Sequence, residues 1–415
     1  MTPVSTGDLF RVFGRIGVLS FGGPAAQIAL MHDELVDRRG WLSEAEFLRA
    51  LSLCMLLPGP EAMQLATYSG WRLRGTFGGL IAGLLFVLPG ACIILALALG
   101  YTAYGQVPLV QAAFVGIKAT VIVIVLQALL KVARRALTTR RAWALAACAF
   151  AALFVFGLPF PVIVVAAGAF GALNYAGSSV QAVPETIPPA RTLPVICLWT
   201  GLWVTPLLAL WVADQAFLLQ IGLFFSKLAV VTFGGAYAVL AYMTQTVVQD
   251  FGWITTAEMI DALGLAETTP GPLILVTQFV AMLAGFAEGG ITRSIAAGAL
   301  TLWVTFIPCF LWIFAAAPYL DLIAARPRLA AALQAITAAI VGVILNLALW
   351  FALHVFFASQ APLGNLALPV PDLSSIDLRA VALTALAGVL LLWARRDMVL
   401  VLALMAGAGV LIDLT

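Results

Sequence analysis

The segment Ser20-Phe21-Gly22-Gly23 returns as Thr232-Phe233-Gly234-Gly235, 212 positions further along the chain. At the same offset, Pro58-Gly59-Pro60 returns as Pro270-Gly271-Pro272. Over the 48 positions that begin at Phe13, 19 residues are identical in the two copies, and no gap is needed to align them. Chance similarity between apolar segments would not keep Gly, Pro and Trp in register. The chain is therefore a tandem duplication.

Composition places the chain in a membrane. Of its 415 residues, 63% are hydrophobic and only 10% are charged, whereas about a quarter of the residues of a soluble domain are charged. Apolar runs of membrane-spanning length recur, for example at 76–100 and 295–317. These features predict an all-α polytopic membrane protein, and in such a chain a duplication favours transport.

Several classes of function are excluded by the same inspection. The net charge of +2 comes without a basic stripe, so no nucleic-acid partner is expected. The five cysteines stand singly in apolar segments, which gives neither a disulfide framework nor metal-ligand spacing. The phosphate-binding element Gly-Lys-Ser/Thr is absent, so we expect no ATP machinery and no cofactor. The charges of Asp8, Arg11 and Arg15 interrupt the first apolar stretch, and no cleavable signal peptide is expected.

Matching loops of the two repeats differ in charge. Asp37-Arg38-Arg39-Gly40-Trp41 aligns with Gln249-Asp250-Phe251-Gly252-Trp253, which carries no base. Conversely, the uncharged turn at 157–161 corresponds to Ala394-Arg395-Arg396-Asp397. Lys and Arg near the ends of spans stay in the cytoplasm, so matching loops lie on opposite faces and the repeats are inverted. The resulting map puts the N-terminus and 17 of the 21 Lys and Arg residues in the cytoplasm.

The predicted organisation has two repeats of one plan. Residues 1–175 form the first, 176–192 a linker rich in Gly, Ser and Pro, 193–213 a connecting transmembrane helix, and 214–415 the second, inverted repeat. Each repeat has two segments broken in the middle, followed by four spanning helices. The broken segments lie near 10–36, 46–71, 217–248 and 258–285, and the spans near 76–103, 107–130, 142–157, 160–175, 291–315, 330–357, 379–394 and 397–412. The broken segments are either re-entrant hairpins or long spans with an unwound centre.

The breaks themselves are the candidate substrate site. A helix that restarts after Gly or Pro presents unsatisfied N–H groups and a partial positive charge at its N-terminus, and four such ends would form a cradle for an oxyanion. The alternative is that these residues only allow close packing or a kink. The predicted substrate-binding residues at the breaks are Phe21, Gly22, Gly23, Pro58, Gly59, Pro60, Phe233, Gly234, Gly235, Pro270, Gly271 and Pro272.

Three basic residues complete the predicted anion site. Arg15 and Lys227 are equivalent and precede the first glycine of their breaks by seven positions. They either attract an anion or mark the membrane interface. Lys118 stands deep in an apolar span, where an ionisable side chain is a functional candidate by default, although pairing with Glu61 would give it a purely structural role.

Acidic and hydroxyl groups also gather at the second break of each repeat. Glu61 follows Pro58-Gly59-Pro60, and Glu267 precedes its counterpart; either carboxylate is a candidate proton carrier, or else a helix-terminal charge or salt-bridge partner. The side chains that could donate hydrogen bonds to an anion are Gln64, Thr67, Thr268, Thr269 and Gln278.

Two further acids have a simpler explanation. Glu46 follows Ser43, and Glu258 follows Thr255, at the three-residue spacing of a capping box. We expect both pairs to begin helices.

With these motifs identified, the chain resembles the chromate ion transporter (CHR) family in its long, two-domain form. The pattern is Phe-Gly-Gly, then a loop ending in Gly-Trp, then Pro-Gly-Pro, in both repeats. The resemblance implies a secondary transporter that exports chromate across the bacterial inner membrane and confers chromate resistance, with sulfate as an analogue or exchange partner. It leaves open the coupling ion, the preference between chromate and sulfate, and whether the chain forms a homodimer.

Two other functional classes fit the membrane composition. An anion channel of the same fold would differ only in the absence of flux coupling. A membrane enzyme acting on a lipid-linked phosphate would use Glu61, Lys118 and the glycine breaks as a half-buried active site. Against an enzyme, the sequence has no nucleophile–base pair near an interface, and inverted repeats serve alternating access.

Overall fold

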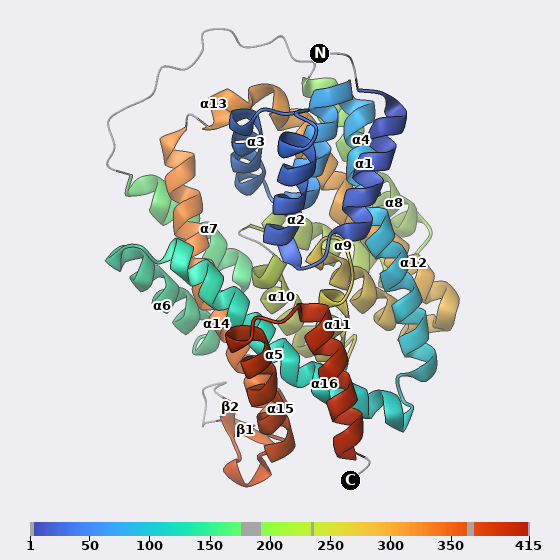
Figure 1. Ribbon diagram of the computed structural model, residues 1–415, viewed down its shortest axis with the longest axis vertical. Helices are drawn as coiled ribbons and strands as arrows, with labels where there is room; N and C mark the ends of the chain where they lie inside the picture. The colour runs from blue at the N-terminus through green and yellow to red at the C-terminus, as the bar shows by residue number, and fades with distance from the viewer. Residues whose placement is uncertain (1–3, 176–191, 234–235, 325, 363–368, 414–415) are drawn as a thin grey trace. The chain divides into compact units, whose positions relative to one another are not determined.

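A computed structural model describes residues 4–175, 192–233, 236–324, 326–362 and 369–413 (Figure 1). Gly234, Gly235 and nearly all of the predicted linker lie outside the described residues. The elements are α1 (Thr6–Leu19), α2 (Gly23–His32), η1 (Asp33–Asp37), α3 (Glu44–Leu56), α4 (Glu61–Tyr104), α5 (Pro108–Ala136), α6 (Arg140–Phe154), α7 (Phe160–Leu173), α8 (Thr192–Val212), α9 (Ala216–Val231), α10 (Ala236–Thr244), η2 (Gln245–Asp250), α11 (Thr256–Glu267), η3 (Leu273–Leu275), α12 (Val276–Ala316), η4 (Ala317–Tyr319), α13 (Leu320–Ala324), α14 (Pro327–Phe356), β1 (Gln360–Pro362), β2 (Pro369–Pro371), η5 (Leu373–Ser375), α15 (Leu378–Gly388), η6 (Val389–Trp393) and α16 (Met398–Asp413).

The prediction of an all-α membrane protein is confirmed. Five helical segments of the described chain are long and apolar enough to cross a bilayer: Glu61–Tyr104, Pro108–Ala136, Thr192–Val212, Leu273–Tyr319 and Pro327–Phe356. Shorter apolar helices occupy Phe160–Leu173, Ala216–Val231, Leu378–Trp393 and Met398–Asp413. A helix therefore stands at each position where the sequence predicted a span.

The chain packs as two compact units, and each unit takes segments from both sequence repeats. The first contains Met1–Leu99, Ala176–Ala236 and Thr269–Ala330, and the second contains Gly100–Tyr175, Tyr237–Thr268 and Ala331–Thr415. The packing units thus do not coincide with the repeats, because the chain crosses from one unit to the other inside α4 and at the breaks of the second repeat.

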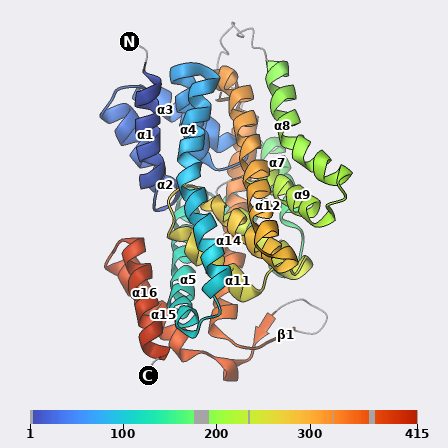
Figure 2. The ribbon, with the colours of Figure 1, turned by 90° about the vertical axis from the view of Figure 1, so that its right-hand side faces the viewer.

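In the first unit, α12 packs against α8 and α9 (Figure 2). The ring of Trp199 stacks on that of Phe310, with their centroids 5.5 Å apart. The indole N–H of Trp303 donates to the carbonyl of Leu202 at 2.8 Å. Aromatic packing together with a bonded indole fixes the lateral position of these helices.

In the second unit, α15 and α16 pack against α5 (Figure 1). Apolar residues from the three helices form a common core that includes Val123, Leu383 and Met405. Gly116 lies directly against the backbone of Met405, where a Cβ atom would clash with the carbonyl oxygen. A glycine at this contact lets two helices approach more closely than side chains would permit.

The duplication is visible in the backbone as well as in the sequence. Inside α4, Gly75 has φ 64° and ψ −160°, and inside α12, Gly290 has φ 70° and ψ −160°. These kinks are 215 positions apart, three more than the offset of the breaks. The three residues of the short turn η3 match this difference. Each predicted hairpin arm and the span that follows it therefore join as one long helix, bent at a glycine whose positive φ other residues rarely adopt.

The predicted helix starts are also confirmed. The Oγ of Ser43 accepts from the backbone N–H of Glu46 at 3.3 Å. Thr255 and Glu258 form a full capping box at the start of α11. The Glu46 carboxylate instead accepts from the Nε of Arg72 at 2.6 Å, so the first repeat keeps only half of the box.

Candidate functional site

The residues that lead into the Phe-Gly-Gly breaks form the same backbone turn in both repeats. The backbone N–H of Phe21 donates to the carbonyl of Leu19 at 2.9 Å, and that of Phe233 donates to Val231 at 3.1 Å. In the first repeat, Gly22 has φ 83° and ends the break, after which α2 begins with a proline in its first turn. Only glycine adopts such a φ without strain, so the Gly-Gly pair is what allows the chain to turn between α1 and α2.

The breaks of the two repeats are bonded to each other reciprocally. The N–H of Gly271 donates to the carbonyl of Ser20 at 2.8 Å, and the N–H of Gly59 donates to the carbonyl of Thr232, also at 2.8 Å. Ser20 is equivalent to Thr232 in the duplication, and Gly59 is equivalent to Gly271. Each Phe-Gly-Gly break is therefore held by the Pro-Gly-Pro break of the other repeat. These four residues all belong to the first compact unit.

This pairing changes which groups can face a ligand. The predicted cradle used the N–H groups of all four breaks, but those of Gly59 and Gly271 are donated to carbonyls. Helix geometry leaves the N–H groups of a first turn without intrahelical partners, so such donors remain at the starts of α2 and α4, for example at Ala62.

Buried amides line the same breaks. Nε2 of Gln27 donates to the carbonyl of Gly271 at 2.6 Å and to that of Ser20 at 3.2 Å. Nε2 of Gln64 donates to the carbonyl of Pro58 at 2.6 Å, and Nε2 of Gln278 donates to Ala91 at 3.1 Å. The predicted donors Gln64 and Gln278 are thus engaged with the backbone. Within the described part of the chain, the Oε1 atoms of all three glutamines are buried without a hydrogen-bond partner.

The two candidate proton carriers have different surroundings. Glu61 is the first residue of α4 and is partly buried. The side chain of Glu267 is buried at the end of α11, and its Oε1 accepts from the hydroxyl of Tyr237 at 2.7 Å. The hydroxyl of Thr268 donates to the carbonyl of Leu265, so it too is engaged locally, and Thr269 is buried.

Lys118 pairs with Asp261, whereas the sequence had suggested Glu61 as its structural partner. Its Nζ lies 3.3 Å from Oδ1 of Asp261, and the other carboxylate oxygen accepts from the hydroxyl of Tyr101 at 2.8 Å. Asp261 is only 4% exposed. The sequence analysis did not single out Asp261, although it aligns with Arg49 of the first repeat. This change from a base to an acid, at equivalent positions of the two aligned repeats, is the sequence signal that could have indicated Asp261.

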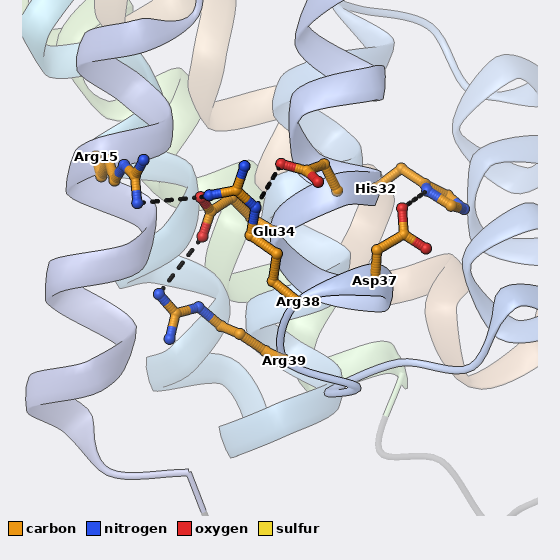
Figure 3. Close-up of polar contacts among 7 residues, drawn as sticks. Arg15, His32, Glu34, Asp37, Arg38 and Arg39 are labelled. Carbon is orange, nitrogen blue, oxygen red and sulfur yellow. Dashed lines mark hydrogen bonds and ion pairs between the residues drawn. The ribbon is translucent and has the colours of Figure 1, made fainter.

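The two equivalent basic residues, Arg15 and Lys227, also have different surroundings. Nη1 of Arg15 lies 3.2 Å from Oε1 of Glu34, whose side chain is buried (Figure 3). Arg38 and Arg39 approach the same carboxylate at 3.5 and 3.4 Å. Glu34 therefore compensates the charge of Arg15 locally, and no sequence pattern had indicated it. Lys227 is exposed on α9.

His32 forms a smaller acid–base cluster beside Glu34. Its Nδ1 lies 3.1 Å from Asp37 (Figure 3). Its Nε2 lies 2.5 Å from Glu44. The hydrogen bond to Glu44 is the largest of the effects that raise the pKa of His32 above its ordinary value. Within the described ranges, no group of three His, Cys, Asp or Glu residues is arranged to hold a metal ion.

Comparison with known proteins identifies the family of the chain. The family model described as "Chromate transporter" matches residues 7–172 and 219–411. A probable chromate transport protein of Synechococcus elongatus is 33% identical over 341 residues, which cover 81% of this chain and 82% of the relative. A chromate transport protein of Pseudomonas aeruginosa is 33% identical over 82% of this chain and 80% of its own length. One from Cupriavidus metallidurans is 29% identical over 81% and 80%. No solved structure matches the chain. Because the family model covers both repeats, the chain belongs to the chromate transporter family.

Proposed function

We propose that the chain is a secondary transporter that exports chromate from the bacterial cytoplasm across the inner membrane. The observation that carries the proposal is the reciprocal bonding of the breaks, Gly271 to Ser20 and Gly59 to Thr232. Interrupted helices expose backbone groups that lipid cannot satisfy, so they are tolerated where they line a cavity or a protein interior. Here both repeats bring their interruptions together, as a substrate site at a repeat interface requires.

Helix ends at the breaks suit an oxyanion. Each helix N-terminus carries about half a positive charge, so several together can compensate a dianion. Chromate and sulfate are both tetrahedral dianions and would use the same donors. The proposed binding residues are those flanking the breaks, with Arg15 and Lys227 attracting the anion. Lys118, which belongs to the second compact unit, is proposed as a third cation that binds the anion.

The proposed topology is inverted, with the broken segments as re-entrant hairpins. Their support is the charge reversal between the loops at 37–41 and 249–253. In a background lacking the native thiols, Arg39→Cys should be shielded from an impermeant thiol reagent in intact cells, while Phe251→Cys should react. Labelling of both variants from the same side would contradict the inversion.

Glu267 is the proposed proton carrier of the breaks. It is buried, and its Oε1 accepts a hydrogen bond from the neutral hydroxyl of Tyr237. A carboxylate in such surroundings is poised to exchange a proton during transport. Glu61 is the second candidate, at the start of α4.

The decisive experiment is uptake of labelled chromate into everted membrane vesicles, with and without a pH gradient, against vesicles that lack the chain. We expect chain-dependent accumulation that unlabelled sulfate reduces. Accumulation only in right-side-out vesicles would mean import, and uptake that never exceeds equilibration would mean a channel. No chain-dependent uptake at all would refute transport of chromate.

A further inference from the structure

A cavity of about 490 Å³ lies beside Lys118 in the second compact unit. Its lining comes from α5, α11, α14 and the start of α15, and its polar side chains are Lys118, Thr256, His354 and Asp377. Lys118 is the one Lys or Arg among the lining residues of this cavity. Its side chain is 24% exposed, so the ammonium group has one side on the cavity and the other on Asp261.

Asp261 lies behind Lys118 and does not line the cavity. One of its oxygens is held by the Tyr101 hydroxyl at 2.8 Å, while the other is 3.3 Å from the ammonium nitrogen. A charge-assisted hydrogen bond is normally 2.7–2.9 Å long. Within the described residues, this second oxygen is buried and has no hydrogen bond. The ion pair is therefore loose, and Lys118 has donors that another acceptor can take.

The remaining acids near the pair are committed elsewhere. Glu258, one turn earlier on α11, accepts from the N–H of Thr255 at 2.7 Å as part of the helix cap. Asp377 accepts from the N–H groups of Arg379 and Ala380 at the start of α15. His354 bonds the carbonyl of Trp350 through Nδ1. Asp261 is thus the carboxylate whose charge is balanced by Lys118.

From this arrangement we propose that Lys118 is an oxyanion-binding site at which the anion displaces Asp261, and that Asp261 takes up a proton when the anion binds. The proposal rests on the proposed function, because it assumes that the substrate is an oxyanion. It names a coupling residue other than Glu61 and Glu267.

The charges of the site explain the linkage. Lys118 and Asp261 together are neutral, so adding a dianion gives a net charge of −2 in surroundings of low dielectric. Uptake of one proton from the bulk solvent by Oδ1 of Asp261 reduces this to −1 and removes the attraction that holds the ammonium group. Tyr101 remains as a donor to Oδ2. One proton is therefore taken up per anion bound, and acidity favours binding.

The test is equilibrium binding of labelled chromate to purified full-length protein across a range of pH, with each variant compared with wild type at the same pH. Because variant and wild type are compared at the same pH, the protonation of chromate affects both affinities equally and does not change their ratio. Asp261→Asn keeps the shape and the Tyr101 contact but cannot be charged. We expect it to bind chromate about tenfold more tightly than wild type at alkaline pH, with the ratio falling to one at acid pH. Lys118→Met should lose at least tenfold in affinity, and adding Asp261→Asn should not restore it.

Matched controls are Lys131→Met, an exposed lysine of the same helix, and Asp250→Asn, an exposed acid of the same unit. Both should bind as wild type does. An affinity ratio for Asp261→Asn that does not change with pH, or recovery of wild-type affinity in the double variant, would overturn the inference. In either case, chromate uptake by wild-type vesicles would leave the proposed function standing. Lys118→Arg keeps the charge and should retain the pH dependence. That result would show that the loss of chromate affinity in Lys118→Met is not misfolding.

Discussion

A single methyl group at Gly271 tests whether the reciprocal bonds between the breaks hold the two repeats together. Gly271 is buried, has φ 93°, and donates its N–H to the carbonyl of Ser20 at 2.8 Å. A Cβ atom added there would lie 3.2 Å from Cδ1 of Leu275 and 3.6 Å from Cα of Gly90. Gly271→Ala therefore strains both the backbone and its packing.

The expected cost follows from these contacts. A non-glycine residue at such a φ costs about 1–2 kcal/mol. If the backbone relaxes to a negative φ instead, it loses the bond to Ser20, worth about 0.5–1.5 kcal/mol, and disturbs the bond from Gln27. With the unrelaxed backbone, the 3.2 Å contact with Leu275 adds about 1 kcal/mol of overpacking to the strain, so we expect Gly271→Ala to lower the free energy of unfolding by about 2–3 kcal/mol. The matched control is Gly252→Ala, at φ 61° in an exposed turn with nothing within 4 Å of the added atom, which should cost only about 1 kcal/mol.

The assay combines unfolding of the purified protein in detergent with chromate uptake by everted vesicles. Gly271→Ala should lose stability and uptake, and Gly59→Ala should behave in the same way, because its Cβ would lie 2.9 Å from both Cys309 Sγ and Gln64 Nε2 at φ 120°. Gly252→Ala should retain uptake. If Gly271→Ala is as stable and active as Gly252→Ala, the paired breaks do not hold the repeats together and our reasoning is wrong.

Three further predictions concern buried or paired charges. Glu34→Gln removes the carboxylate shared by Arg15, Arg38 and Arg39 and should lower the free energy of unfolding by about 1–3 kcal/mol. The control Glu44→Gln, at an exposed acid nearby, should cost less. Equal effects of the two variants would contradict a special role for Glu34. The raised pKa of His32 means that its bonds stabilise the fold fully below its ordinary pKa of about 6.5 and are lost as the pH rises through the raised value. The melting temperature of wild type should therefore exceed that of His32→Gln at acid pH, and the difference should shrink on alkalinisation; a constant difference would refute this. Tyr237→Phe removes the hydroxyl that donates to the buried Glu267 carboxylate and should lower the free energy of unfolding by about 1–3 kcal/mol. Adding Glu267→Gln should largely restore the stability. No restoration in the double variant would show that the loss comes from packing.

Local sequence sufficed for the elements themselves. Apolar runs long enough to span a bilayer predict helices, and those at 107–130 and 330–357 become α5 and α14 with only their ends shifted. Capping pairs predict starts, as Thr255 and Glu258 show at α11. Glycine and proline predict breaks because their backbone preferences act within a few residues.

The partners across the fold were not accessible in this way. Nothing local distinguishes Asp261 from any other acid on a helix, and its pairing with Lys118 arises only when α11 packs on α5. The buried position of Glu34 among three arginines likewise depends on how α1, η1 and the following loop meet.

The sequence alone thus determined that this protein is a duplicated, all-helical membrane protein with interruptions at matched positions, because hydrophobicity, turn chemistry and repetition are properties of the chain itself. Only the tertiary structure decided that the interruption at Ser20 meets the one at Gly271, and that at Thr232 meets the one at Gly59. A backbone hydrogen bond uses groups that every residue carries. Its partner therefore depends on how distant helices pack, and residue type does not indicate which backbone groups will pair.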